Sequence, residues 1–387
     1  MVTIMENFPF QRVKTYPSFV VKFTVGALVA VLLTSCTEMA GPAESAGVEI
    51  ATRNTVFGRT VSGAGCGVGV SRAVALPEFV DMPDAYAGNI NDQTTDDMKS
   101  WAERIMQLSS RARVSENDAL LLKTELLRAA GSNAMQWPSN WSQGEDRPPS
   151  VIYHTMETLY PAVIGYAQNK DIFSLQEQEI FENWSGEIVS RVGRTEKIRQ
   201  WQLDNKKYQY GALLAAQSLV TSDRRGFSQS RRIYETAMRG MRSDGSLPGD
   251  TGRGGNALHY SNLALANLVA IAELNFATGT DLYGSPDDPR SIHHAIKFLA
   301  QATSNPSLVA GYADTPGWED GSFIGYSPTR QDRRWADRSS SGWGYYYLAR
   351  YQNTDAGRQL LAASPFLRLG RSGVHQQSGG NARCNVG

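Results

Sequence analysis

The stretch Asp244-Gly-Ser-Leu-Pro-Gly-Asp-Thr-Gly-Arg253-Gly-Gly-Asn-Ala-Leu-His259-Tyr260-Ser-Asn-Leu-Ala-Leu265 contains the junction at which a turn-rich segment passes into an apolar helix. Its glycines and Pro248 exclude regular structure before about residue 256. Beyond that point, apolar residues occupy most faces of a helix predicted at 256–278. This pattern is typical of an inner helix that its neighbours bury. His259 and Tyr260 lie in its first turn.

A cation, an imidazole and a phenol gather at the mouth of this helix. Arg253 lies in the glycine-rich approach, where the backbone N–H groups of a helix N-terminus attract anions, and His259 and Tyr260 follow it. The combination predicts a site for an acidic substrate. Residues 190–253 contain thirteen Lys/Arg against six Asp/Glu, although the whole chain has 38 of each. Such a basic band attracts a polyanion, while solvated helix faces are an alternative explanation for most of these charges.

Helical patterns continue through most of the chain from about residue 95. Ser115 and Ser174 resemble N-caps, each with an acidic residue three positions later. No convincing alternation of apolar and polar residues predicts a strand. Apolar helices that alternate with amphipathic ones predict an all-α fold, an α/α toroid of helical hairpins over residues 95–387. No motif repeats at a fixed period, as a superhelical array would require. Further helices are expected at 119–130, 151–169, 174–193, 205–221, 228–242, 290–304 and 340–352.

Residues 1–36 have the features of a lipoprotein-type signal peptide. Basic residues precede an apolar run at 23–33 that is too short to span a bilayer comfortably. The run ends in Leu33-Thr-Ser-Cys36, which resembles the bacterial lipobox, whose cysteine is acylated. We therefore expect export to the periplasm and a lipid anchor on Cys36. Thr37 rather than Asp follows this cysteine, which indicates the outer membrane. An ordinary signal peptide or an uncleaved anchor is the alternative.

Residues 37–94 are expected to form a tether and an irregular entry segment, because much of this part is rich in small residues and lacks helical periodicity. Cys66 lies here, and the remaining cysteine, Cys384, lies near the C-terminus. In an oxidising periplasm these two could close the chain end to end. Two unpaired thiols are equally compatible with the sequence.

Several familiar chemistries lack their motifs in this chain. There is no Walker A loop, no strand-borne dinucleotide fingerprint, no Gly-x-Ser-x-Gly elbow and no His-Glu-x-x-His pair. The adjacent His293 and His294 would point about 100° apart on a helix and make a poor metal pair. We therefore expect no metal and no cofactor. The export signal argues against nucleic acid as the polyanion, so we expect an acidic polysaccharide as the binding partner. We also expect a monomer.

A second constellation opens the helix predicted at 205–221. Asn205 and Lys206 occupy its start, and Tyr210 lies one turn after Lys206 on the same face. Taken alone, this pattern is better explained by a capping Asp204 or Asn205 with surface lysines. Four further residues are candidates for contact with the substrate, with core packing as the alternative for the aromatic ones: His259, Tyr210, Trp137 and Trp141.

Together the two constellations resemble the family-five alginate lyases, which are periplasmic polysaccharide lyases built on an α/α toroid. That family carries an Asn-His pair at the head of an inner helix, followed by an Arg and a Tyr at set spacings. Here Asn205 matches the Asn, and Arg253 lies 47 positions after Lys206. Tyr260 lies seven positions after Arg253 and follows His259. Both spacings match the family, and the main departure is Lys206 at the position of the family's His.

The resemblance, which extends loosely over residues 137–279, implies β-elimination from a (1→4)-linked polyuronate. The fork of Arg253 and the amide of Asn205 would neutralise the substrate carboxylate, so that the weakly acidic C5 proton can leave. Tyr260 would be both base and acid, because flanking cations favour a phenolate. Lys206 would add positive charge, or would itself be the base.

Three classes of function stay open at this point. Mannuronate-rich alginate is the family substrate, and glucuronan or another acidic exopolysaccharide is the competitor. A glycoside hydrolase on a similar toroid would need two carboxylates that flank one bond, and Asp204 and Asp250 are the nearby pair. A catalytically silent polyuronate-binding lipoprotein is the third class, because Lys206 departs from the family pattern.

Overall fold

The computed structural model describes the parts of the chain that form the folded unit within residues 43–387. The sequence-based predictions for Cys36 and Trp141 lie outside the described residues. Within the described ranges, no helix is both long enough and apolar enough to cross a bilayer. The ranges are 55–56, 59–60, 66–80, 93–137, 149–200, 202–253, 256–305, 307–312, 341–363 and 374–386.

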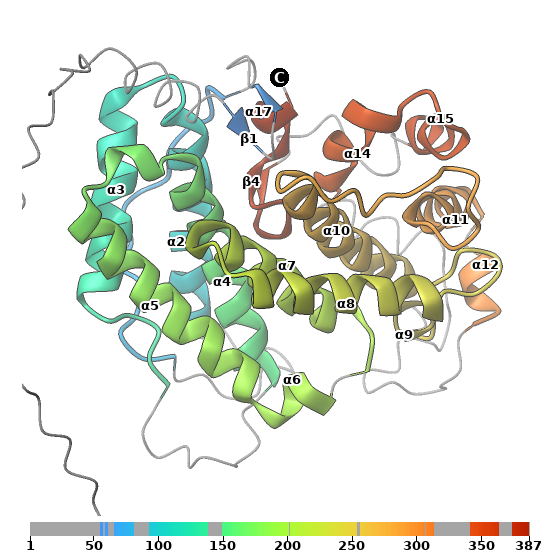
Figure 1. The fold of residues 1–387 in the computed structure, drawn as a ribbon, viewed down its shortest axis with the longest axis horizontal. Helices are drawn as coiled ribbons and strands as arrows, with labels where there is room; N and C mark the ends of the chain where they lie inside the picture. The colour runs from blue at the N-terminus through green and yellow to red at the C-terminus, as the bar shows by residue number, and fades with distance from the viewer. Residues whose placement is uncertain are drawn as a thin grey trace, which may run out of the picture. The chain divides into compact units, whose positions relative to one another are not determined.

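Five pairs of helices dominate this unit, and each pair consists of an inner and an outer helix (Figure 1). The inner helices are α2 (Gln93–Arg111), α4 (Pro149–Gln168), α7 (Asn205–Thr221), α10 (Ala257–Phe276) and α14 (Trp343–Tyr351). The outer helices are α3 (Glu116–Gly131), α5 (Leu175–Arg194), α8 (Arg224–Gly240), α11 (Ile292–Ser304) and α15 (Asp355–Ala362).

The inner helices contact one another in chain order, α2 with α4, α4 with α7, α7 with α10, and α10 with α14. Each outer helix packs on the inner helix of its own pair. This arrangement confirms the predicted all-α fold of the α/α toroid type. The remaining elements are short: β1 (Thr55–Val56), β2 (Arg59–Thr60), η2 (Lys170–Ile172), α6 (Glu196–Gln200), α9 (Pro248–Thr251), α12 (Ser307–Ala310), β3 (Val374–His375), η4 (Gln376–Ser378), β4 (Gly380–Asn381) and α17 (Ala382–Val386).

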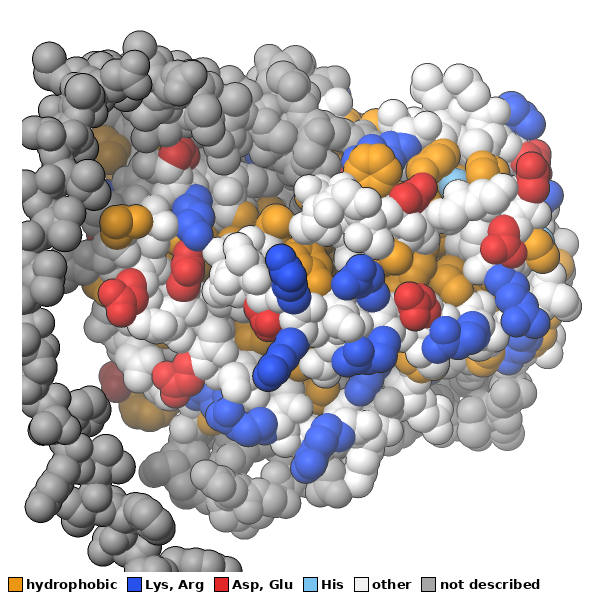
Figure 2. All heavy atoms as spheres, viewed as in Figure 1, with side chains coloured by type: hydrophobic (Ala, Val, Ile, Leu, Met, Phe, Trp, Pro, Cys, Tyr) orange, Lys and Arg blue, Asp and Glu red, His pale blue; other side chains and the backbone are white. Residues whose placement is uncertain are grey.

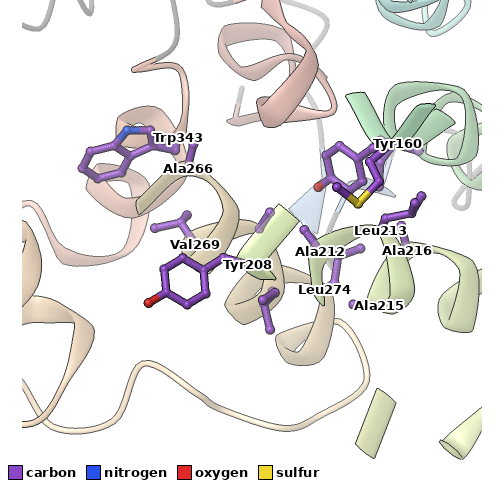
Figure 3. Packing of buried hydrophobic residues seen from close by; sticks show 14 of the residues in the cluster. Tyr160, Tyr208, Ala212, Leu213, Ala215, Ala216, Ala266, Val269, Leu274 and Trp343 are labelled. Carbon is purple, nitrogen blue, oxygen red and sulfur yellow. The ribbon is translucent and has the colours of Figure 1, made fainter. Parts of the chain in front are cut away.

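Helices α7 and α10 share the most extensive contact between any two described helices, and buried side chains of both meet in the core (Figure 3). Nearly every residue of α10 up to Asn275 is buried, which confirms the predicted inner helix. Small residues on α7 let the two helices approach each other. A Cβ at Gly211 would come 2.8 Å from the Ile271 side chain of α10, so only glycine fits there without a shift. The first turns of both helices, which carry the predicted site residues, are therefore held by a tightly packed core.

Two predictions about local structure are wrong. Residues before 256 were expected to lack regular structure, but Pro248–Thr251 form the short helix α9. Pro248 occupies its first turn, where the missing N–H has no partner to lose and the restricted φ suits a helix. Helix α8 begins at Arg224 rather than at residue 228, because Asp223 caps it by accepting hydrogen bonds from the N–H groups of Arg225 and Gly226.

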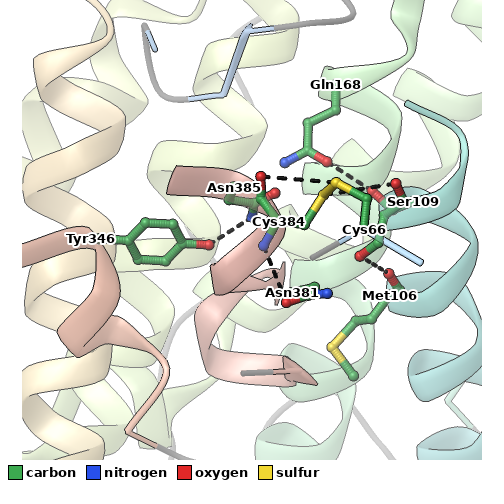
Figure 4. The surroundings of a disulfide bond; sticks show 9 residues. Cys66, Met106, Ser109, Gln168, Tyr346, Asn381, Cys384 and Asn385 are labelled. Atoms are coloured by element: carbon green, nitrogen blue, oxygen red, sulfur yellow. Dashed lines mark hydrogen bonds between the residues drawn. A yellow bond between two sulfur atoms is a disulfide. The ribbon is translucent and has the colours of Figure 1, made fainter. Parts of the chain in front are cut away.

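The C-terminal segment packs among the inner helices. Strand β4 and η4 contact α2 and α4, η4 also contacts α10, and α17 contacts α14. A disulfide joins Cys66 to Cys384, with 4.7 Å between their Cα atoms, and both cysteines are fully buried (Figure 4). Beside it, the Asn385 Nδ2 group donates to the Tyr346 hydroxyl at 2.7 Å. Of the two alternatives that the sequence left open, the disulfide is the one formed.

Candidate active site

The first turn of α7 is organised by Asp204. This residue is the N-cap of the helix, and its Oδ1 accepts hydrogen bonds from the N–H groups of Lys206 at 3.0 Å and Lys207 at 3.3 Å. Asn205 is the first helical residue, as predicted, and it is almost fully buried. Its side-chain amide makes no hydrogen bond to any described residue. An uncommitted amide is thus held at the start of an inner helix.

Helix α9 brings Arg253 to the same place. The Arg253 Nη2 atom lies 2.6 Å from the Asp204 Oδ2 atom, and its Nε donates to the Gly249 carbonyl at 3.1 Å. A Cβ at Gly249 would come 2.2 Å from the Leu203 carbonyl oxygen, so glycine is required where these two loops meet. The side chains of Arg253 and Asp204 are only 15% and 10% exposed, so solvent screens their attraction less than at the surface.

A second carboxyl group, that of Asp250, lies beneath this pair. Asp250 is fully buried, and its Oδ1 accepts the N–H of Asn205 at 3.0 Å. Burial, and then the nearby Asp204 carboxylate, raise the pKa of Asp250 well above its usual range. Its Oδ2 has no hydrogen-bond partner among the described residues. Burial therefore disfavours the charged form of Asp250, and its carboxyl group positions the Asn205 backbone.

The start of α10 completes the site. The guanidinium carbon of Arg253 lies 4.8 Å from the centre of the Tyr260 ring, and the ring centres of Tyr260 and His259 are 5.3 Å apart. Farther along α10, the Asn267 amide donates to the Asn205 carbonyl at 3.2 Å, which ties this helix to α7. Residues predicted from two distant stretches of sequence are therefore neighbours in the fold.

Lys206 and Tyr210 both lie on α7 but in different surroundings. Lys206 is partly exposed in the first turn. Tyr210 is buried and faces α5, because a Cβ at Gly193 would come 2.4 Å from its hydroxyl. Burial raises the pKa of Tyr210 above its usual value. The neighbouring Lys207 donates its Nζ to the Ile198 carbonyl of the preceding α6 segment, so this lysine ties α7 to α6.

Trp137 is mostly buried, and the guanidinium carbon of Arg191 lies 5.2 Å from its ring centre. Its Nε1 lies 3.5 Å from the Thr155 hydroxyl of α4, at the limit of a hydrogen bond. No described group of three or more His, Cys, Asp or Glu side chains has the arrangement of a metal site.

The partnership of Asp204 with Arg253 was not predicted from the sequence. Asp204 stood out only as a possible cap or a possible hydrolase carboxylate, and nothing in its local pattern indicated a partner 49 positions away. The one available signal was chemical. An arginine in a glycine-rich loop that becomes partly buried needs a carboxylate beside it, and few carboxylates lie in the flanking segments.

The model of the family described as alginate lyase matches residues 83–309 of this chain. A polysaccharide lyase of Stenotrophomonas maltophilia strain K279a is 32% identical over 163 residues, which cover 42% of this chain and 43% of that protein. An alginate lyase of Pseudomonas fluorescens strain Pf-5 is 22% identical over 270 residues, which cover 62% of this chain and 68% of that one. The chain thus spans between about two fifths and two thirds of the length of these relatives.

The fold is also similar to that of a solved histidine-to-alanine variant of alginate lyase A1-III complexed with tetrasaccharide. The TM-score is 0.68 at 20% identity, over 87% of this chain and 94% of that chain. At that identity the likeness concerns the fold alone. The family match covers more than half of the sequence, from residue 83 to residue 309, and includes the first turns of α7 and α10. The chain therefore belongs to the alginate lyase family.

Proposed function

We propose that this protein is an exported polysaccharide lyase that cleaves a (1→4)-linked polyuronate by β-elimination and leaves an unsaturated uronate end. One observation carries the proposal. Arg253, the uncommitted amide of Asn205 and the phenol of Tyr260 converge at the facing ends of two inner helices. These are the group types needed to neutralise a carboxylate and to move a proton beside it.

Arg253 and Asn205 would bind the uronate carboxylate. The Arg253 guanidinium donates to Asp204 through Nη2, and its planar array of N–H donors is suited to the recognition of carboxylates. The Asn205 amide makes no hydrogen bond to a described residue, so no internal bond has to break before it donates to substrate. Asp204 pairs with Arg253, and Asp250 accepts the backbone N–H of Asn205. Both donors are therefore positioned before the substrate binds, which favours the transition state.

Tyr260 would move both protons. The C5–H bond breaks, its proton passes to the phenolate oxygen, and the electron pair left behind is delocalised into the adjacent carboxylate, which the cationic and amide donors stabilise. That pair then forms the double bond between C4 and C5 as the C4–O4 bond breaks, and O4 takes the proton back from Tyr260 as it leaves. The Arg253 guanidinium over the ring favours the negative phenolate that begins this cycle.

An alginate-like polyuronate is the favoured substrate, because several relatives are named alginate lyases. A panel of mannuronan, guluronan and glucuronan tests this proposal, with absorbance of the unsaturated product followed in the ultraviolet. An increase in this absorbance with mannuronan supports an alginate lyase. An increase with glucuronan alone would identify glucuronan as the substrate instead. Binding without any rise would indicate a silent polyuronate-binding protein.

The geometry weighs against the glycoside hydrolase alternative. Such an enzyme needs two carboxylates on opposite sides of a scissile bond. Asp250 is fully buried and accepts the Asn205 N–H, while Asp204 accepts two backbone N–H groups and the Arg253 guanidinium. Both oxygens of Asp204 are occupied in holding the site together, and Asp250 is fully buried, so neither carboxyl group is available to a sugar.

We predict that Lys206→His stays active but loses activity, relative to the unmodified protein, as the pH rises through about 6.5. This follows if Lys206 supplies only positive charge. The imidazolium of the histidine can replace that charge at acid pH, but the neutral imidazole present above about pH 6.5 cannot. Rates on an active polyuronate between pH 5 and 9 measure this shift.

The matched variant is Lys206→Met, which removes the charge and keeps the length of the side chain. We expect this variant to retain reduced but measurable turnover. Complete loss of turnover with binding intact would instead assign the base to Lys206 and contradict the role given to Tyr260.

We further propose that Cys36 carries a lipid that anchors the protein at the periplasmic face of the outer membrane. The chain has three cysteines, and Cys66 and Cys384 form a disulfide, so Cys36 alone is left for acylation. A buried disulfide also suits an oxidising compartment.

Replacing Cys36 by alanine should move the protein out of the membrane fraction, as soluble or unprocessed chain. Cell fractionation together with mass spectrometry of the mature N-terminus measures this outcome. The Arg72→Gln variant is the control, because it changes an exposed residue without touching the signal or the disulfide. A native protein that is already soluble and carries no lipid would refute the anchor.

A further inference from the structure

Helix α8 has two contrasting faces. Its buried face, which includes Ile233 and Tyr234, packs on α7, and Gly211 of α7 accepts a hydrogen bond from Ser230 at 2.7 Å. The opposite face carries what we call the arginine row, five arginines that are exposed or half-buried: Arg224, Arg225, Arg231, Arg232 and Arg239. Figure 2 shows basic side chains gathered where α8 crosses the molecule in Figure 1.

The charges of the arginine row are poorly balanced by nearby acids. Arg224, Arg225 and Arg231 form no ion pair with any described carboxylate. Arg232 donates to the Ser228 hydroxyl at 2.9 Å, and Arg239 lies 3.9 Å from a Glu235 oxygen, a long exposed pair. Since the chain as a whole has zero formal net charge, this excess is local. The row therefore presents a positive field to solvent.

The spacing of the row suits a regular polymer. Residues seven positions apart lie on nearly the same side of a helix, about 10.5 Å apart along its axis. Arg224 and Arg231, and likewise Arg225 and Arg232, have this separation, and Arg239 continues the series from Arg232. The carboxylates that recur along an extended acidic polysaccharide can contact successive arginines of the row. A compact ligand would contact only one or two of these arginines.

The row also leads toward the active site. Helices α7 and α8 form a hairpin joined by Ser222 and Asp223, so the C-terminal end of α8 lies at the same end as Asn205. After α8, Arg242 donates to the Thr251 hydroxyl at 2.8 Å, within the segment that carries Arg253. The row therefore runs about 22 Å along α8 away from that end.

We propose that the arginine row is a second binding surface for the acidic polysaccharide, which holds polymer outside the active site. This inference rests on the proposed function, since the active site supplies the identity of the polyanion. The arginine row would bind the polysaccharide through electrostatic attraction rather than through a shaped pocket. Its contribution should therefore fall as salt rises and should vanish for oligosaccharides too short to reach beyond the active site.

The test compares long mannuronan with its tetrasaccharide, using the full chain with four arginines replaced together. We expect the apparent KM for the polymer to rise about tenfold or more in the variant. The kcat/KM for the tetrasaccharide should change little, and the salt dependence on polymer should weaken. The replacements are Arg224→Gln, Arg225→Gln, Arg231→Gln and Arg232→Gln.

A second quadruple variant is the matched control, because it removes the same total charge from exposed positions elsewhere. We expect this control to behave as the native protein does on both substrates. Equal losses in the two variants, or equal losses on polymer and tetrasaccharide, would overturn the proposal. The control replacements are Arg72→Gln, Lys99→Gln, Arg290→Gln and Arg358→Gln.

Affinity electrophoresis in gels that contain mannuronan measures binding without turnover, so it separates this proposal from the proposed lyase activity. Retardation that the row variant loses and the control keeps supports the surface even in a protein that cleaves nothing. Vesicles with and without anionic lipid address the competing partner. A row variant that binds mannuronan normally but no longer binds anionic vesicles would overturn the proposal in favour of a membrane contact.

Discussion

Replacing Tyr260 by phenylalanine should lower kcat on an active polyuronate by about 10³-fold or more, because general base and general acid catalysis are lost together. The ring stays, so its contact with the Arg253 guanidinium should survive. The Tm should therefore change little, and substrate should still bind. Initial rates from the absorbance of the unsaturated product, with Tm from circular dichroism, measure both effects.

Tyr345→Phe is the matched control, because it deletes the same group from a half-buried tyrosine of α14 whose hydroxyl makes no hydrogen bond to another described residue. This variant should retain native kinetics. Substantial turnover in Tyr260→Phe, with the control unchanged, would remove Tyr260 from both proton transfers and direct attention to Lys206.

The second large effect concerns Arg253. Replacement by lysine keeps the charge but loses the planar fork, which has to hold Asp204 and the substrate carboxylate together. We expect a loss of roughly 2–4 kcal/mol in transition-state stabilisation, or about 30- to 1,000-fold in kcat/KM, by analogy with removal of one oxyanion donor. Steady-state kinetics on the same polymer measure the loss. An Arg253→Lys enzyme with native kcat/KM would exclude Arg253 from the mechanism.

The Asp204→Asn variant tests how far the contribution of Arg253 depends on its ion pair with Asp204. Asparagine also caps helices well, so α7 should remain intact. The guanidinium then loses its internal counter-charge but keeps its fork. We expect a smaller loss of kcat/KM than in Arg253→Lys. A double-mutant cycle measures the coupling, because contacting residues are generally non-additive.

Much of the fold could be predicted because its strongest signals are local. The apolar run of α10 has one physical explanation, burial on nearly all sides, and the structure agrees. Ser174 is another local signal, and it forms a complete capping box with Glu177. The segment Val374–Val386 went unpredicted, because its elements are only two to five residues long and have too few positions for a recognisable period.

The site could be predicted only in part. Spacing related Asn205, Arg253 and Tyr260, which the fold brings together through α7, α9 and α10. The support behind them could not be predicted, because the contacts of Asp204 and Asp250 cross between segments and depend on burial. Burial also determines the surroundings of Tyr210, which faces Gly193 of α5. A sequence records which side chains share a helix face, but not which neighbouring helix will cover that face.

The disulfide between Cys66 and Cys384 limits when the chain can complete its folding. Its partners are 318 positions apart, so the bond can form only after every helix from α2 to α15 has been synthesised. In the chain-entropy model, a loop of this size restricts the unfolded chain enough to stabilise the folded state by about 6 kcal/mol. A chain that stops before Cys384 would lack this restraint and the packing of α17 on α14. Its Cys66 thiol would also be left unpaired and open to thiol–disulfide exchange.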